Sequence, residues 1–445
     1  MEDFFKLKEN GTDVRTEIIA GLTTFLSMAG VLAINPMILS ASGMDQASVF
    51  TATAISAAVA TIVMALFANY PVALASGMGV NIYFAYTICP MVGTDRPWEV
   101  ALAAVLVEGL LFIVLSFTNF RESLVDDIPA SLKTGISAGI GLFVAFVGLK
   151  NSGIVVLEEG NIFMGDLTDA SVALALIGLI IIAILEQRHV TGSIFLGIMI
   201  TWMLGIAAQA AGWYVPDPEA GMASVYPSLA FTGLRMDYFL AFDFRWIGSH
   251  LLQFAVIVFS LFYVDVFDTV ATLIGVATNA GFIGEDGKLP RSKQALLSDA
   301  IGTCVGACTG TSTVTSFAES AIGVAAGGRT GLTALTTGIL FLVSLIFAPV
   351  FTAIPSFAIT PALIFVGYLM MKQITGLRFD GVPMSDVIPP FLAIIMMPFT
   401  FSIANGIMFG ILSYVILKVS EGRIREIKPV MWVSAAMFAL YIVLG

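Results

Sequence analysis

Charged residues are scarce in this chain. Asp, Glu, Lys and Arg make up 11% of its 445 residues, whereas a soluble protein averages about 25%. Apolar runs recur from one end to the other, and hydrophobic residues account for 58% of the total. This composition predicts an all-α polytopic membrane protein. The net charge of −11 argues against a nucleic acid as partner.

Cysteine and histidine are also rare. Three cysteines, Cys89, Cys304 and Cys308, do not indicate a disulfide framework. Cys304 and Cys308 share an expected helix, but no histidine or carboxylate is spaced to complete a metal site with them. We interpret them as small packing residues. The sequence therefore predicts neither a metal nor a cofactor.

The apolar runs divide the chain into about fourteen membrane segments. A polar connection over 212–246 separates two halves, and its amphipathic part near Tyr238, Phe242 and Trp246 is expected at the membrane interface. The stretch 431–444 is either one further span or a helix on the surface. The expected segments are 16–40 (interrupted at Asn35-Pro36), 49–70, 77–90, 100–117, 128–148, 170–185, 192–211, 247–277, 297–308, 316–326, 332–352, 360–371, 386–400 and 402–418.

The two halves resemble each other. Residues 193–200 (SIFLGIMI) and 402–409 (SIANGIMF) share Ser, Ile, Gly, Ile and Met at corresponding positions. Seven segments per half is an odd number, so the second copy must run inverted through the membrane. Paired short segments in an inverted repeat indicate the central binding site of a transporter.

The segment 310–331 (GTSTVTSFAESAIGVAAGGRTG) is the most unusual in the chain. Alternating Thr and Val favour a strand, and 316–326 favours a short helix that carries one carboxylate, Glu319. A break at membrane depth is tolerated only where it lines a protein cavity. The short third segment, with Asn81, is expected to form the opposite wall.

Two further carboxylates, Asp265 and Asp268, lie on one face of an apolar helix because they are three residues apart. Acids at membrane depth are functional-site candidates. The alternative is that Ser and Thr hydroxyls cap them within a packed helix. For Glu108, in the fourth segment, a structural hydrogen bond competes with a role in transport. Gly135 and Gly139 are interpreted as a helix-packing pair.

Basic residues in the loops indicate the orientation. Counting fourteen spans places them on one side, which predicts a cytoplasmic N-terminus and the cell (inner) membrane as location. The residues are Lys6, Lys8, Arg15, Arg121, Lys133, Arg188, Lys288, Arg291, Lys293, Lys418, Arg423, Arg425 and Lys428, with Arg96, Arg235 and Arg245 as exceptions.

Six short stretches of the sequence, given at the end of this paragraph, resemble the nucleobase–cation symporters, in particular their azaguanine-type purine permease branch. The resemblance spans nearly the whole chain. The matching strings are 21–26 (GLTTFL), 77–81 (GMGVN), 265–269 (DVFDT), 310–315 (GTSTVT), 319–320 (ES) and 327–331 (GGRTG).

The resemblance implies two inverted seven-helix repeats, with short strands before half-helices 3 and 10. It implies a core domain (16–118 and 247–353) that moves like an elevator against a gate domain (128–211 and 354–445), which usually forms a homodimer. The implied activity is uptake of adenine, guanine or hypoxanthine coupled to H⁺, with Na⁺ as the less favoured ion. No enzymatic activity is implied.

By position, Asp265 and Glu319 match the substrate carboxylates, and Phe317 and Ala318 lie beside the base. Asn81 and Asp268 match supporting polar residues, and the matching string extends to Thr269. Glu319 and the other acids are candidates for the coupling proton. From its chemistry, Phe25 or Phe317 could stack on the purine ring. The chain departs from the branch at Gly30, Ser76, Ile82 and Phe317, where an aromatic residue, Pro, Ala and Tyr are usual.

Other functions fit less well. A transporter of the same fold for a pyrimidine base or a small anion is the main alternative, but an anion site requires positive helix ends or a basic residue. A membrane aspartyl protease needs acids on two facing helices, whereas Asp265 and Asp268 share one. A channel would not need paired broken helices.

Overall fold

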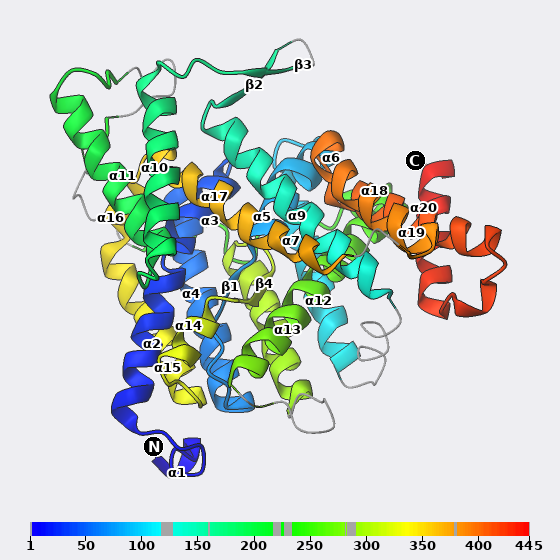
Figure 1. Ribbon diagram of the computed structural model, residues 1–445, viewed down its shortest axis with the longest axis horizontal. Helices are drawn as coiled ribbons and strands as arrows, with labels where there is room; N and C mark the ends of the chain where they lie inside the picture. The colour runs from blue at the N-terminus through cyan, green and yellow to red at the C-terminus, as the bar shows by residue number, and fades with distance from the viewer. Residues whose placement is uncertain are drawn as a thin grey trace.

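The computed structural model describes residues 2–116, 128–158, 161–216, 224–226, 234–280, 282, 291–377 and 381–444. The described chain is helical, with two pairs of short strands (Figure 1). In this part, nine helices are long and apolar enough to cross a membrane, and several shorter apolar helices accompany them. The protein is therefore a multi-pass membrane protein, as the composition predicts.

The helices form two packed groups. The first, the core group, contains α2 (Val14–Met28), α3 (Val31–Ser40), α4 (Gln46–Val63), α5 (Met78–Tyr83), α7 (Pro97–Ser116), α12 (Leu251–Ala280), α13 (Ser292–Thr309), α14 (Ser320–Ala325) and α15 (Gly331–Ser344). The second, the gate group, contains α9 (Ala130–Asn151), α10 (Ala170–Gln187), α11 (Ser193–Ala210), α17 (Ser356–Met371), α18 (Met384–Thr400) and α19 (Ile403–Ser420).

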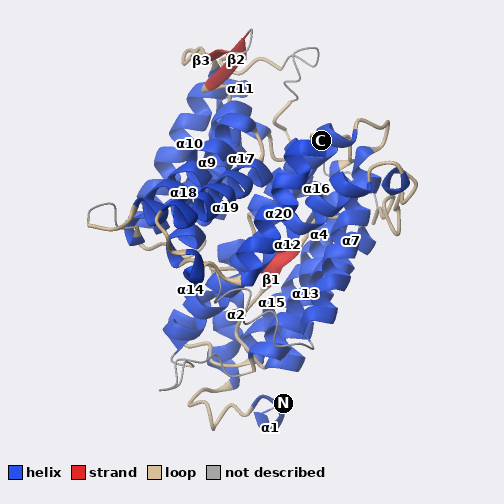
Figure 2. Cartoon of the chain, turned by 90° about the vertical axis from the view of Figure 1, so that its right-hand side faces the viewer, coloured by secondary structure: helices blue, strands red, loops and turns tan. Residues whose placement is uncertain are grey.

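Shorter elements join these helices. α1 (Glu2–Phe5) and the hairpin of β2 (Val155–Glu158) and β3 (Asn161–Met164) lie at opposite ends of the molecule (Figures 1 and 2). The remaining elements are the π-helical stretches Met64–Ala68 and Phe84–Ile88, α6 (Cys89–Val92), α16 (Ala348–Thr352), α20 (Pro429–Leu444) and four short 3₁₀ turns at Trp246–Gly248, Leu345–Phe347, Lys372–Gly376 and Ile424–Glu426.

Two short strands lie side by side within the core group. β1 (Leu74–Ser76) and β4 (Val314–Ser316) pair antiparallel, with Ala75 opposite Thr315. Each strand precedes a short helix, β1 before α5 and β4 before α14. This is the strand and half-helix arrangement expected for both halves. The pairing satisfies backbone N–H and C=O groups that lipid could not.

The first apolar segment breaks at a different place from the one predicted. α2 ends at Met28 and α3 begins at Val31, whereas Pro36 lies inside α3. The Asn35 side chain donates hydrogen bonds to the hydroxyls of Thr53 (2.7 Å) and Thr311 (2.8 Å). Asn35 therefore ties a continuous α3 to its neighbours and does not end a helix.

Glycines allow close packing within the gate group. A Cβ at Gly135 would lie 2.5 Å from Pro390, and one at Gly139 would lie 2.8 Å from the sulfur of Met397. Both neighbours belong to α18. The predicted packing role of this pair is confirmed.

The connection that precedes α12 lies against the core group, and the last helix, α20, contacts the core group as well. Tyr238 packs edge-on against Trp98, and the Leu240 N–H donates to the carbonyl of Cys308 (2.8 Å). α20 packs against both α12 and α19, and the hydroxyls of Tyr263 and Ser434 are 2.7 Å apart. Residues 431–444 are thus part of the helix packing.

Glu17, on α2, is a buried carboxylate that caps another helix. It accepts hydrogen bonds from the backbone N–H of Arg329 (2.8 Å) and Thr333 (3.0 Å) and from the Thr333 hydroxyl (2.6 Å). α15 begins at Gly331, so Glu17 satisfies N–H groups at the start of α15 that have no partner within that helix. Nothing in the sequence around Glu17 singles it out.

We predict that Glu17→Ala destabilises the protein by about 3 kcal/mol, because hydrogen bonds to a charged acceptor contribute about 1.5–3 kcal/mol each and do not add fully. Thermal unfolding in detergent measures this loss. Glu9→Ala is the control, since Glu9 is exposed and, within the described part of the chain, forms an ion pair with Lys6. Equal melting temperatures for the two variants would contradict the capping role.

Candidate functional site

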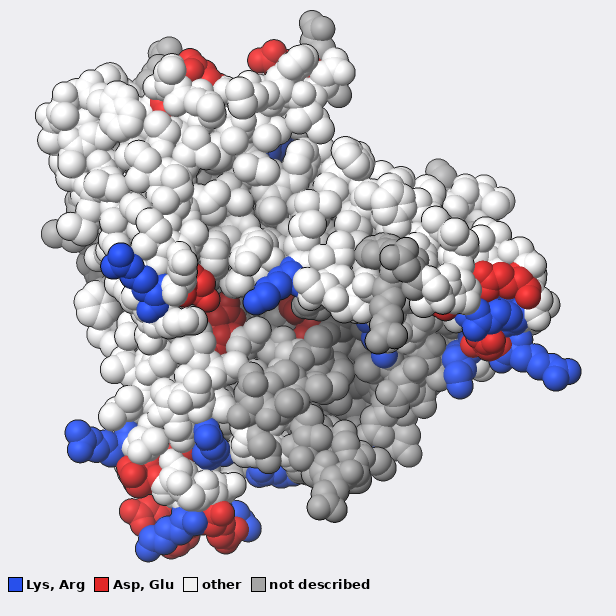
Figure 3. Space-filling model, viewed as in Figure 1, with Lys and Arg blue, Asp and Glu red and all other residues white. Residues whose placement is uncertain are grey.

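A cavity of about 530 Å³ lies between the core and gate groups. In Figure 3 acidic side chains are visible in a hollow on the face of the molecule. The core side is lined by Ser27, Gly77, Met78, Gly79, Asp268, Thr272, Val276, Thr315, Ser316, Phe317, Ala318, Glu319, Ala321 and Ile322, and the gate side by Ser137, Glu186, Gly192, Ser193, Ile194, Val366, Leu369 and Met370.

The crossed strands position the central part of this lining. The N–H of Phe317 donates to the carbonyl of Ala73 (3.0 Å), and the Ala73 N–H donates to the hydroxyl of Ser320 (3.0 Å). These bonds fix the bend between β4 and α14. Phe317, Ala318 and Glu319 line the cavity from this bend.

Two of the predicted carboxylates meet at the cavity. Asp268 comes from α12, and its carboxylate accepts a hydrogen bond from Thr315 of β4 (3.4 Å). Glu319 comes from the start of α14. Among the described lining residues there is no Lys or Arg. The cavity therefore presents carboxylate acceptors, and Phe317, which is 8% exposed, contributes to its lining.

Asp265 and Thr269 lie deeper, among buried acids. The Thr269 hydroxyl is 3.3 Å from a carboxylate oxygen of Asp265 and donates to Asp299 on α13 at 2.9 Å. The Ser316 hydroxyl, which belongs to the cavity lining, is 3.3 Å from the same oxygen of Asp299. A chain of hydroxyls and carboxylates thus runs from the cavity wall to Asp265. The substrate-binding role of Asp265 stays a prediction.

Asn81 and Phe25 are also placed away from the cavity lining. Asn81 is fully buried, accepts a hydrogen bond from the Ser312 hydroxyl and donates to the carbonyl of Ser76 (3.5 Å). It thus joins α5 to the segment before β4. Phe25 packs edge-on against Phe341, with ring centroids 5.2 Å apart. Their binding roles likewise stay predictions.

Glu108 makes a structural contact in the same region. Its carboxylate accepts a hydrogen bond from the Thr313 hydroxyl at 3.1 Å, and the residue is fully buried. Thr313 lies one residue before β4. This contact matches the structural alternative for Glu108.

Asp299 and Glu186 were not predicted from the sequence as residues at or near the site. Asp299 lies in an expected membrane segment, where a lone acid is a signal in its own right. Glu186 lies at the end of α10 and accepts a hydrogen bond from Ser193 (2.5 Å), so the gate group also brings a carboxylate to the cavity. In the sequence Glu186 looks like an ordinary loop residue, because nothing shows that α10 ends beside α14.

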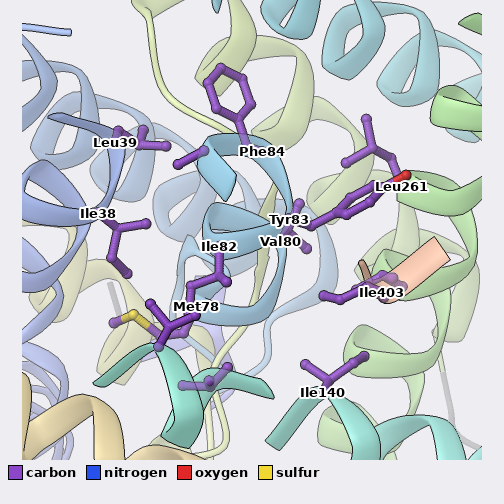
Figure 4. Close-up of a cluster of buried hydrophobic side chains, with 14 of the residues drawn as sticks. Ile38, Leu39, Met78, Val80, Ile82, Tyr83, Phe84, Ile140, Leu261 and Ile403 are labelled. Atoms are coloured by element: carbon purple, nitrogen blue, oxygen red, sulfur yellow. The ribbon is translucent and has the colours of Figure 1, made fainter. Parts of the chain in front are cut away.

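Of the four departures from the family pattern, Phe317 lines the cavity. Gly30 faces the gate group, since a Cβ there would lie 3.5 Å from Ile194 and from Ile198. The Ser76 hydroxyl is 2.8 Å from that of Thr311, and Ile82 is buried in the apolar cluster of Figure 4. Position 317 is thus the departure in direct contact with the cavity.

Residues 15–409 match the sequence model of the permease family, and the chain belongs to that family. It is a transporter and not an enzyme. Similar proteins include the adenine permease AdeP of Escherichia coli, 40% identical over 445 residues, covering 100% of this chain and 96% of AdeP. The guanine/hypoxanthine permease PbuO of Bacillus subtilis is 41% identical over 442 residues, covering 98% of each chain.

Solved structures with the same fold include transporters of anions. The transmembrane domain of the cyanobacterium bicarbonate transporter BicA has a TM-score of 0.64 at 15% identity, over 89% of this chain and 97% of that one. Murine Solute Carrier 26 family member A9, in its inward-facing state, has a TM-score of 0.64 at 12% identity, over 91% of this chain and 68% of that one. These likenesses confirm the expected inverted-repeat fold with a core and a gate.

We predict that Asn81→Ala and Ser312→Ala each destabilise the protein by about 1–3 kcal/mol, because each leaves a buried polar partner without its hydrogen bond. The double variant should be no less stable than the worse single variant. Thermal unfolding of the four proteins forms the cycle. Additive losses would show that the two residues act separately, against the contact described above.

Proposed function

We propose that this protein transports purine nucleobases, namely adenine, guanine or hypoxanthine. The observation that carries the proposal is the cavity, whose described lining contains Asp268, Glu319 and Phe317 and no basic residue. Full-length similarity to an adenine permease and a guanine/hypoxanthine permease supports the substrate class.

The chemistry of the cavity suits a purine. A purine is flat and carries N–H donors along its edges, and a carboxylate accepts such donors in charge-assisted hydrogen bonds. Glu319 is the proposed main acceptor, with Asp268 beside it. The ring of Phe317 offers a stacking surface. An anion would be repelled by the same carboxylates, so the fold shared with anion transporters does not favour an anionic substrate here.

Proton coupling is part of the proposal. Moving a charged carboxylate through the membrane is costly, and a bound proton removes that cost. Asp268 and Glu319 at the cavity, with Asp265 and Asp299 behind Ser316, are the groups that could carry the proton. Na⁺ is the less favoured coupling ion.

The proposed transport cycle moves the core group against the gate group in an elevator-type motion. The cavity lies on the boundary of these groups, where such a motion would carry it across the membrane. In Figure 3 basic side chains lie at the end of the molecule that carries the N-terminus, and others lie at mid-height and at the right-hand edge. A cytoplasmic N-terminus in the cell membrane is proposed from the basic loops of the sequence. The homodimer through the gate group rests on the family resemblance alone.

The first experiment is uptake of radiolabelled hypoxanthine, guanine and adenine in cells that lack their own purine transporters, with and without a protonophore. We expect saturable uptake that collapses with the proton gradient. Glu319→Gln should reduce uptake about tenfold or more, because a charge-assisted hydrogen bond contributes about 1.5–3 kcal/mol. Glu158→Gln, at an exposed strand position, is the control. Full proton-coupled uptake by Glu319→Gln would exclude Glu319 from binding and coupling.

We further predict that Phe317→Ala weakens base binding about two- to tenfold, since an aromatic contact contributes about 0.5–1.5 kcal/mol. Phe25→Ala should leave the affinity unchanged, because Phe25 packs against Phe341 away from the cavity lining. Equilibrium binding of the labelled base to purified protein measures both. The reverse ranking would assign the stacking role to Phe25.

A further inference from the structure

A second cluster joins the core and gate groups away from the cavity. It consists of Tyr86 and Thr87 from the core group and Lys150, Asn151 and Phe401 from the gate group. We call it the far-end cluster. Tyr86 and Thr87 lie in the π-helical stretch Phe84–Ile88 that continues α5. The gate residues lie at the end of α9 and directly after α18.

Two hydrogen bonds cross the boundary at this cluster. The Thr87 hydroxyl donates to the backbone carbonyl of Phe401 at 2.7 Å, and the Asn151 amide donates to the hydroxyl of Tyr86 at 2.8 Å. The Lys150 ammonium lies 5.8 Å from the ring centre of Tyr86 and 5.3 Å from that of Phe401, within the range of cation–π attraction. Each contact can form and break without unfolding a helix.

Phe401 has an unusual backbone. Its φ of 51° and ψ of 33° place it in the left-handed region, which a bulky residue rarely adopts. Its ring packs edge-on against Phe143 and Phe146 of α9, at 6.3 and 5.2 Å. The gate group therefore holds Phe401 in this conformation, with its carbonyl directed to Thr87. The left-handed conformation also closes α18, because the Phe401 N–H donates to the carbonyls of Met397 and Pro398.

The far-end cluster and the cavity occupy different parts of the same boundary. Ser137 of α9 lines the cavity, and Lys150 lies 13 residues further along that helix (150 − 137), a rise of about 20 Å. Between them, α5 packs against the gate. Figure 4 shows Val80, Ile82 and Tyr83 in a buried cluster with Ile140 and Ile403. The core and gate groups are thus separated by the cavity around Ser137 and contact each other at the C-terminal end of α9.

We propose that the far-end cluster closes the substrate pathway at the C-terminal end of α9, and that it separates each time the cavity opens toward that end. We call the side of the membrane at that end the far side and the other one the cavity side. The inference rests on the proposed transport function. The buried apolar side chains of α5 provide the sliding surface, whereas the polar contacts of the cluster hold one end position. Thr87 and Asn151 then control the balance between the two end positions without touching the base.

The test uses a cavity thiol as a reporter that does not depend on purine transport. In a background with Cys89, Cys304 and Cys308 replaced by Ala, Ala318→Cys is labelled by a membrane-impermeant thiol reagent applied to one side of the membrane at a time. Thr87→Val removes the donor to Phe401 and should raise labelling from the far side about fivefold, because one hydrogen bond shifts the balance between the states. Unchanged far-side labelling would overturn the proposal.

A cross-link tests the same closure in the opposite direction. Tyr86→Cys with Asn151→Cys, joined by a short bifunctional thiosulfonate, should abolish purine uptake and far-side labelling of Ala318→Cys, and a reductant should restore both. Labelling from the cavity side should persist. The matched control joins Lys6→Cys to Glu9→Cys. These two residues are exposed neighbours within one segment, where the Lys6 Nζ and a Glu9 carboxylate oxygen are 3.1 Å apart. Full uptake by the cross-linked protein would refute the closure.

These readouts separate the two proposals. If the unmodified protein transports no purine but Thr87→Val and the cross-link still change far-side labelling, the closure stands and the substrate assignment fails. If purines are transported but neither change affects far-side labelling, the closure fails and the substrate assignment stands.

Discussion

The antiparallel crossing of β1 and β4 is the constraint on which the rest of the structure depends. A helix that stops halfway through a membrane leaves backbone groups without partners, and lipid supplies none. Here each broken segment supplies the partners of the other, with Asn81, Ser312 and Glu108 adding side-chain hydrogen bonds around the crossing. Because the strands satisfy each other, the chain can bend at Phe317 and present Glu319 to a cavity.

The sequence carried enough information to predict the architecture, and part of the site. The alternation of Thr and Val before a short apolar helix predicted the break at β4, and Glu319 and Asp268 were predicted from being acids at membrane depth. The positions of Asn81 and Asp265 behind the cavity lining could not be read from the sequence. They depend on which face of α5 and of α12 meets β4, and the contact of α5 with the segment before β4 joins residues 231 positions apart. Glu186 was missed because its place beside the cavity depends on packing between distant helices, whereas Asp299 could have been predicted as an acid in an expected membrane segment.

Fold and substrate are set by different parts of this molecule. The backbone is shared with transporters of bicarbonate and other anions at 12–15% identity, whereas the cavity presents carboxylates and no basic residue among its described lining. Under the proposed function, side chains at the bends before α5 and α14 select the substrate, and the motion of the core group against the gate group carries it across. Position 317 is where this chain departs from its family in direct contact with the cavity.

The last helix, α20, packs against α12 of the core group and α19 of the gate group. α12 carries Asp268, so a displacement of the core must strain or slide the contacts that Ser434 and Phe438 make with Tyr263 and Phe259. Much of the opposite surface of α20 is exposed, including Val433 and Val443, and would lie against acyl chains. Under the proposed elevator motion, the friction that lipid exerts on α20 enters the rate of the cycle and makes turnover sensitive to the viscosity of the surrounding bilayer.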